Sequence, residues 1–166
     1  MSGVVMKVIL QDLKKVEADA LIVGFFQDIR PLKGAAGRLD WLLCGALSSL
    51  LIKNKLKGAL GDVALFTSQG KVTSQKIFLV GLGTKADFSA LSLRTAVKIA
   101  SACVVGAGIT HVAMEHFQTV GGILSEDTVP AFREGLAEGA GGHSLKVSLI
   151  APDEVAYRQL LPLTMS

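Results

Sequence analysis

The stretch Lys76-Ile-Phe-Leu-Val-Gly-Leu-Gly-Thr84 decides the fold of this 166-residue chain. An apolar run ends there in Gly81 and Gly83, and a segment with helical spacing follows. A buried strand that ends in Gly-x-Gly can turn tightly and bring backbone N–H groups close to an anion, although the same tripeptide also serves simply to leave a sheet. A dinucleotide fingerprint would need a third glycine, and Ala86 stands at that position. The stretch therefore predicts a buried strand with a glycine turn, whose role depends on the rest of the chain.

Apolar runs and helical periodicity alternate along the whole sequence. The patterns predict strands over residues 4–10, 20–26, 62–67, 76–80, 111–116 and 145–150, and helices over residues 38–53, 89–105, 125–140 and 152–161. Only a short turn separates the third and fourth strands, which indicates an antiparallel hairpin. The alternation predicts one α/β domain over residues 1–166, with a three-layer α/β/α architecture around a mixed sheet.

The composition indicates a globular chain, because half of its residues are hydrophobic and 19% are charged. The 17 basic residues barely exceed the 14 acidic ones and are scattered, and one Trp and one Tyr offer few stacking platforms, so we expect no nucleic-acid partner. The longest uncharged apolar run, residues 99–110, is too short to cross a bilayer. The N-terminus lacks the features of a secretory signal. We expect no membrane partner and a cytoplasmic location.

Cysteines and histidines form no chemical motif. Cys44 and Cys103 fall in apolar helical segments without CxxC spacing, so we expect both to be reduced and buried. His111 and His116 lie on one predicted strand, five residues apart, and are expected to point to opposite faces. His143 stands in a loop without an identifiable acid or nucleophile partner. We expect no catalytic residue, no metal site and no cofactor.

Three glycine-rich loops, residues 28–37, 81–86 and 119–124, follow predicted strands. Open α/β sheets bind their ligands outside the C-terminal ends of the strands, so these loops are where a site is expected. A pair of glycines before a helix, as in the third loop, can form a nest for an anion, or it can be a turn and nothing more.

The motifs on these loops resemble known families. Lys57-Gly-Ala-Leu-Gly-Asp62, Val80-Gly-Leu-Gly83 and Ala20-Leu-Ile-Val-Gly24 resemble the N-terminal domain of the leucyl aminopeptidase (cytosol aminopeptidase) family, which implies a macro-domain-like fold. Gln11-Asp12-Leu13, Asp19-Ala-Leu-Ile-Val23 and Gly34-Ala-Ala-Gly37 are similar to the start of ADP-ribose-binding macro domains, and Thr119-Val-Gly-Gly-Ile-Leu-Ser125 resembles their second phosphate loop. The tail over residues 147–157 resembles the strand and helix that close a macro domain.

The glycine loops and these resemblances together give a set of candidate ligand-binding residues: Asp12, Gly34, Gly37, Arg38, Gly81, Gly83, Gly121 and Gly122. The resemblance implies that Asp12 accepts a hydrogen bond from an adenine amine; the alternative is a solvated turn residue. Arg38 stands at a predicted helix start, where a cation opposes the helix dipole. It therefore faces either an acidic ligand or partner, or solvent.

The sequence departs from both families where their chemistry lies. No segment resembles the aminopeptidase motif Asn-Thr-Asp-Ala-Glu-Gly-Arg, and Gly24-Phe-Phe-Gln27 stands where macro domains need asparagines. The preferred hypothesis is a non-catalytic macro-like module for assembly or regulation, which forms a homo-oligomer or binds an aminopeptidase-like protein, because the apolar composition predicts surface that subunits would bury. The alternatives are a nucleotide or ADP-ribose binder, and a metallopeptidase with its metals in this domain.

Overall fold

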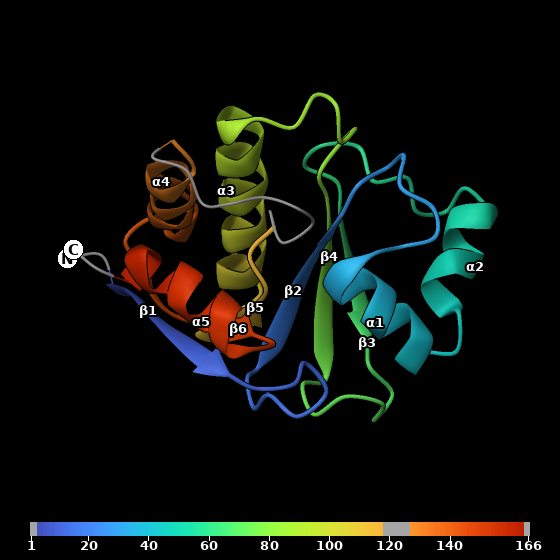
Figure 1. The fold of residues 1–166 in the computed structure, drawn as a ribbon, viewed down its shortest axis with the longest axis horizontal. Coiled ribbons are helices and arrows are strands. Elements are labelled where there is room, and N and C mark those ends of the chain that lie inside the picture. The colour runs from blue at the N-terminus through green and yellow to red at the C-terminus, as the bar shows by residue number, and fades with distance from the viewer. Residues whose placement is uncertain (1–2, 118–126, 165–166) are drawn as a thin grey trace.

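A mixed β-sheet forms the centre of the fold (Figure 1). The computed structural model describes residues 3–117 and 127–164. In the described chain the sheet has six strands in the order β1-β6-β5-β2-β4-β3, all parallel except β3, which runs antiparallel to β4. Their bounds are β1 Gly3–Leu10, β2 Ala20–Phe25, β3 Val63–Thr67, β4 Lys76–Gly81, β5 His111–Met114 and β6 Ser144–Ala151. The predicted mixed sheet and the β3–β4 hairpin are confirmed.

Helices cover both faces of this sheet, which confirms the predicted three layers. They are α1 Gly34–Leu42, α2 Ala46–Ile52, α3 Ala90–Gly106, α4 Thr128–Ala140 and α5 Glu154–Leu160, followed by the 3₁₀ turn η1 Leu161–Thr164. In Figure 1, β2 and β4 lie between α3 on one side and α1 on the other. The predicted start of α4 at residue 125 lies outside the described residues.

The central strands are buried on both faces, so they take part in two separate cores. Along β2, Ala20 and Ile22 belong to the core beneath α3 and α4, whereas Leu21 and Val23 belong to the core beneath α1 and α2. All four of these side chains are at most 1% exposed. Because successive residues of a strand point to opposite faces, a continuous apolar run is what a strand covered on both sides requires.

The predicted helix over residues 38–53 is wrong, because the chain forms two helices bent by 107°. Cys44 and Gly45 adopt positive φ angles of 56° and 83° and break the helical path. The carboxylate of Asp40 then caps α2, since its Oδ1 accepts hydrogen bonds from the N–H groups of Leu47 (2.9 Å) and Ser48 (3.1 Å). Cys44 is exposed at this break, which contradicts the expected burial, and Cys103 is half-buried; both thiols are free.

No single helix in the described ranges is long and apolar enough to cross a membrane. The bent pair α1 and α2 passes that test only when its two helices are taken together, by length and composition alone.

Gly81 and Gly83 allow the end of β4 to pass directly against residues 58–62. The N–H of Gly81 donates to the carbonyl oxygen of Asp62 (2.8 Å), and the N–H of Gly83 donates to that of Gly58 (2.9 Å). A Cβ on Gly81 would lie 2.2 Å from the carbonyl oxygen of Ala59. Gly83 has a φ of +76°, a conformation that glycine adopts without strain. Close backbone packing therefore accounts for Gly81, and the positive φ angle accounts for Gly83.

We predict that Gly81→Ala lowers the free energy of unfolding by about 2–3 kcal/mol, because the added methyl group forces backbone apart in an already filled site. Urea denaturation followed by circular dichroism measures this change. Gly106→Ala is the matched control: it lies at the end of α3 with no atom within 4 Å of the added Cβ, so its stability should be unchanged or slightly raised. Equal effects of the two substitutions would contradict the close-packing explanation.

Candidate functional site

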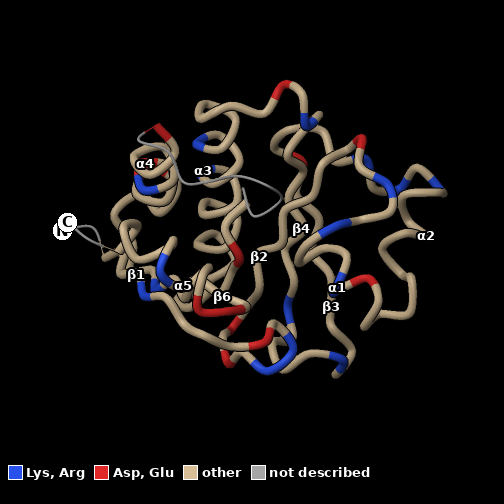
Figure 2. Tube along the Cα trace, viewed as in Figure 1, with Lys and Arg blue, Asp and Glu red and all other residues tan. Residues whose placement is uncertain are grey.

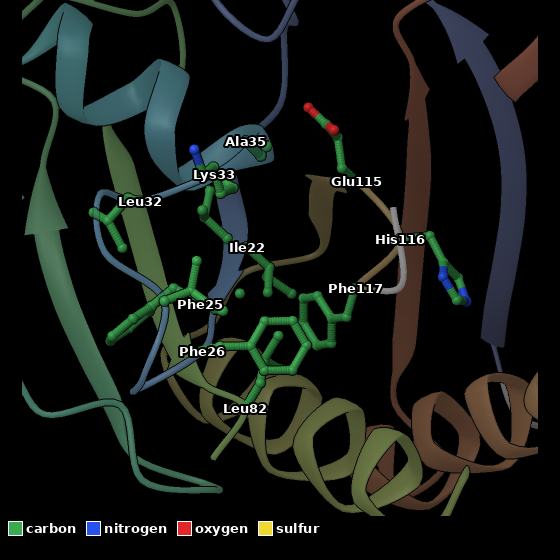
Figure 3. A pocket seen from close by; sticks show the side chains of 14 residues that line it. Ile22, Phe25, Phe26, Leu32, Lys33, Ala35, Leu82, Glu115, His116 and Phe117 are labelled. Atoms are coloured by element: carbon green, nitrogen blue, oxygen red, sulfur yellow. The ribbon is translucent and has the colours of Figure 1, made fainter. Parts of the chain in front are cut away.

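The C-terminal ends of β2 and β5 meet at a crevice that the chain fills with its own side chains. Figure 3 shows Phe26, Phe117 and Leu82 gathered there, with Phe25 on the other side of β2. The remaining cavity measures about 30 Å³ in the described residues, which is room for a water molecule or two. A nucleotide does not fit this space as it stands.

An ion pair closes the crevice on the side of α1. The guanidinium of Arg38, on α1, contacts the carboxylate of Glu115, which directly follows β5. Glu115 is only 5% exposed, whereas Arg38 is 46% exposed. In Figure 3 the carboxylate points away from the phenylalanines, on the side of Lys33 and Ala35. Arg38 therefore meets an acidic group of the chain itself, and this pair ties α1 to the neighbouring strand.

A second, more open groove runs between the loop after β1 and helix α1. It measures about 620 Å³ and is lined by Asp12, Leu13, Lys14, Leu32, Lys33, Gly34, Gly37, Arg38, Trp41 and Leu42. The structure thus brings together four of the expected site residues: Asp12 from the loop after β1, and Gly34, Gly37 and Arg38 from α1. Trp41 borders the groove and is 80% exposed. The groove is mostly apolar, with Lys14 and Lys33 adding positive charge to it.

Each of these four residues also has a role within the fold. The Oδ1 of Asp12 accepts a hydrogen bond from the N–H of Lys14 (2.9 Å), as expected of a turn residue. Gly34 begins α1 with a φ of +59°. A Cβ on Gly37 would lie 2.5 Å from the carbonyl oxygen of Leu32, so only glycine lets α1 pack on that loop.

Gly81 and Gly83 do not line this groove. The N–H groups of Gly81 and Gly83 are occupied by carbonyl oxygens of the chain, so they are not available to an anion. Their loop does adjoin the loop after β2, because the N–H of Gln27 donates to the carbonyl oxygen of Gly83 (2.9 Å). Gly121 and Gly122, with the third glycine loop, lie outside the described residues.

Sequence reasoning missed Glu115, Phe117 and Trp41. Glu115 falls near the end of the predicted strand over residues 111–116 and Phe117 directly follows it, at the edge of the sheet where sites form, and that position was the available signal. Trp41 falls between the apolar helical positions Leu39 and Leu42, so its exposure was readable from the periodicity. Figure 2 shows acidic and basic residues interspersed along the described chain. The distribution of charge in the sequence therefore did not indicate where the crevice or the groove lies.

The histidines lie at separate places, and the prediction that His111 and His116 share a strand is wrong. His111 is on β5, with its Nε2 2.9 Å from Ser148 Oγ, and its pKa is lowered, first by burial and then by Lys146. His116 lies beyond the end of β5, with its ring centroid 4.8 Å from that of Phe132, and burial lowers its pKa to about 4. His143 has its Nδ1 3.0 Å from the carbonyl oxygen of Ala140, at the end of α4. Within residues 3–117 and 127–164, no three of His, Cys, Asp and Glu are grouped so as to hold a metal ion.

We predict that Arg38→Met lowers the free energy of unfolding by about 2 kcal/mol, because it leaves the buried Glu115 carboxylate without its counter-ion. Adding Glu115→Gln to the same variant should recover part of the loss. Arg94→Met is the control: Arg94 is 41% exposed and pairs across α3 and α4 with the exposed Glu134 and Glu138, so its loss should lower the stability much less than the loss of Arg38. Chemical denaturation of the four proteins measures these changes, and equal losses for both single variants would contradict the role given to Glu115.

We predict that His116 makes the chain less stable in acid. Its pKa is near 4 in the folded state and about 6.5 when unfolded, so the unfolded chain takes up the proton first. The contribution of neutral His116 to the free energy of unfolding is therefore complete above pH 6.5. It is lost at about 1.4 kcal/mol per pH unit as the pH falls toward 4. Denaturation midpoints from pH 7 to pH 4.5 should fall less steeply for His116→Gln than for the native chain. Parallel curves for the two proteins would be the contrary result.

Comparisons with known proteins agree with this geometry. The family model of the cytosol aminopeptidase family, N-terminal domain, matches residues 22–140. A probable cytosol aminopeptidase of Geobacter sulfurreducens is 31% identical over 121 residues, which are 72% of this chain and 24% of that protein. One from a Cyanothece species is 39% identical over 83 residues, which are 49% of this chain and 17% of that protein. This chain therefore spans about a quarter of these relatives or less.

Solved structures show the same fold at low sequence identity. A mutant of tomato leucine aminopeptidase superposes with a TM-score of 0.69 at 18% identity, over 96% of this chain and 35% of that one. A mutant macrodomain of Oceanobacillus iheyensis superposes with a TM-score of 0.72 at 13% identity, over 92% and 87% of the two chains. The predicted macro-domain-like fold is confirmed, and the chain belongs to the cytosol aminopeptidase family, whose N-terminal domain it matches.

Proposed function

We propose that this chain is a non-catalytic assembly module, through which copies of the chain associate into a homo-oligomer. Its match to the N-terminal domain of the family, and to a quarter or less of the aminopeptidases it resembles, supports a role separate from the peptidase chemistry of those longer proteins. The filled crevice at the ends of β2 and β5 supports the same view, because the chain uses that space for its own packing.

Exposed apolar side chains are the observation that carries this proposal. Six large apolar side chains of the described surface are more than half exposed: Val5, Trp41, Ile52, Leu65, Leu91 and Val155. Trp41 and Ile52 are about 80% exposed on the adjacent helices α1 and α2. Large exposed apolar patches usually mark surfaces that bind other proteins, and tryptophan is enriched among the residues that dominate the binding energy of such interfaces.

Light scattering on the purified chain tests the proposal. We expect a mass above that of one chain, which rises with protein concentration. Association through apolar surface should persist or strengthen in sulfate, whereas association through surface ion pairs should weaken with salt. A strict monomer at high concentration would overturn the proposal.

A second candidate, a nucleotide or ADP-ribose binder, is favoured by the groove that gathers Asp12, Gly34, Gly37 and Arg38. One of the similar macrodomains, from Oceanobacillus iheyensis, was solved with ADPR. The pairing of Arg38 with Glu115 weighs against it, because a ligand phosphate would have to compete with a carboxylate for that guanidinium. Calorimetry with ADP-ribose and related nucleotides decides the matter: no heat at millimolar ligand excludes this candidate.

Peptidase activity is the third reading, since the relatives are named as probable cytosol aminopeptidases. We propose that the isolated chain does not cleave a leucine chromogenic amide in the presence of manganese or zinc, and turnover in that assay would reverse this. We also propose a cytoplasmic location, which fits the name of these relatives and the two free thiols of Cys44 and Cys103.

A further inference from the structure

The strand β3 ends the sheet with an open side. It is last in the strand order, and in the described chain it pairs only with β4. Just before β3, the carbonyl oxygen of Asp62 accepts a hydrogen bond from the N–H of Gly81. Just after β3, the N–H of Ser68 donates to the carbonyl oxygen of Gln75. Residues of an antiparallel strand alternate between facing their partner and facing away. Ala64 and Phe66 therefore bond to β4, whereas Val63, Leu65 and Thr67 direct their N–H and C=O groups outward.

This edge carries none of the side chains that usually protect one. Proteins prevent edge-to-edge pairing with lysines, prolines or a covering segment. β3 reads Val-Ala-Leu-Phe-Thr, without charge or proline, and Leu65 in its middle is 57% exposed. At the opposite edge of the sheet, β1 has an exposed lysine, Lys7, near its middle. The β3 edge is thus open to a further strand, and the β1 edge is defended.

We propose that the β3 strands of two copies of this chain pair in antiparallel fashion about a two-fold axis at Leu65, so that the two sheets become one. This proposal rests on the assembly function and names the surface that performs it. With Leu65 on the axis, Leu65 faces its own copy and Val63 faces Thr67 of the second copy. Each of these facing pairs exchanges two backbone hydrogen bonds, which satisfies every outward N–H and C=O group of both strands.

The side chains of β3 fit a second copy of themselves. On one face of the joined sheet Leu65 would pack against Leu65, flanked by the pairs of Val63 with Thr67. On the other face the small Ala64 would lie opposite the large Phe66, and such cross-strand pairs are the units that stabilise a sheet. The one charged residue next to β3, Asp62, would face Ser68 of the second copy, so no like charges meet. This self-complementarity is the reason for choosing a second copy as the occupant.

Replacing Leu65 by lysine tests the pairing. We expect Leu65→Lys to weaken self-association at least tenfold in sedimentation equilibrium, because two lysines would meet on the axis. Leu10→Lys is the matched control: Leu10 is 47% exposed but lies at the end of β1, at the opposite edge of the sheet, so the same substitution there should leave association unchanged. Thermal unfolding should be similar for both variants, since both side chains are exposed.

A disulfide tests the register. In a Cys44→Ser, Cys103→Ser background, Leu65→Cys should form a covalent dimer on mild oxidation, because facing residues of a hydrogen-bonded pair have Cα atoms about 5.5 Å apart, within disulfide range. Thr67→Cys should not, since the two copies of Thr67 would lie about 14 Å apart along the strands.

The outcomes separate this proposal from the assembly function on which it rests. Two results would overturn the two-fold β3 pairing and leave the assembly function standing. The first is an oligomer whose mass does not change in Leu65→Lys. The second is an oligomer that Leu65→Lys weakens but that Leu65→Cys does not cross-link. A strict monomer overturns both. Loss of association in Leu65→Lys, with cross-linking by Leu65→Cys and not by Thr67→Cys, supports the pairing.

Discussion

Burial of β2 and β4 on both faces is the constraint on which the rest of the structure depends. Every side chain from Ala20 to Val23 and from Ile77 to Val80 is at most 4% exposed, and a fully buried Leu, Ile or Phe contributes about 1.5–3 kcal/mol. Such strands need helices on both sides, and parallel strands need crossover connections to supply them. Among the described strands only β3 is joined to its neighbour by a hairpin, through residues 68–75. β3 therefore lies at the edge of the sheet, and the hairpin brings no crossover connection that would cover its outer side.

The same topology explains why the crevice at the ends of β2 and β5 holds the chain's own side chains. Parallel strands bring their following segments to one edge, and here those segments contribute aromatic rings and an ion pair. Gly24 makes room for this filling, because a Cβ there would lie 2.7 Å from the ring of Phe117. Glu115 is buried at the same end of the sheet, and Arg38 on α1 is its counter-ion. The crevice thereby links both layers of helices to the sheet.

The sequence predicted the layers well because each follows from local patterns. Continuous apolar runs indicated β2 and β4, and helical spacing indicated α3. The structure shows that Ser89 caps α3, because its side chain accepts a hydrogen bond from the N–H of Ser92. The break between α1 and α2 was missed, although Gly45 and Asp40 stand at the positions that make it.

The candidate site was less predictable because its determinants are long-range. Gly81 contacts residues 58–62, Arg38 contacts Glu115, and Asp12 lines one groove with α1. None of these placements can be read from the spacing of residues in the sequence. The sequence named Asp12, Gly34, Gly37 and Arg38 as separate candidates, and the structure brings them to one groove. Gly121 and Gly122 lie outside the described residues, so their anion nest stays a prediction.

Amide hydrogen exchange along β3 tests the central claim, that this module works through its outer edge, most directly. Val63, Leu65 and Thr67 have outward N–H groups, whereas Ala64 and Phe66 are bonded to β4 at every concentration. The account predicts that the first three amides exchange fast in dilute solution and become protected as concentration rises, while the other two stay protected throughout. Exchange at Val63, Leu65 and Thr67 that does not change with concentration, in a sample shown to associate, would contradict it.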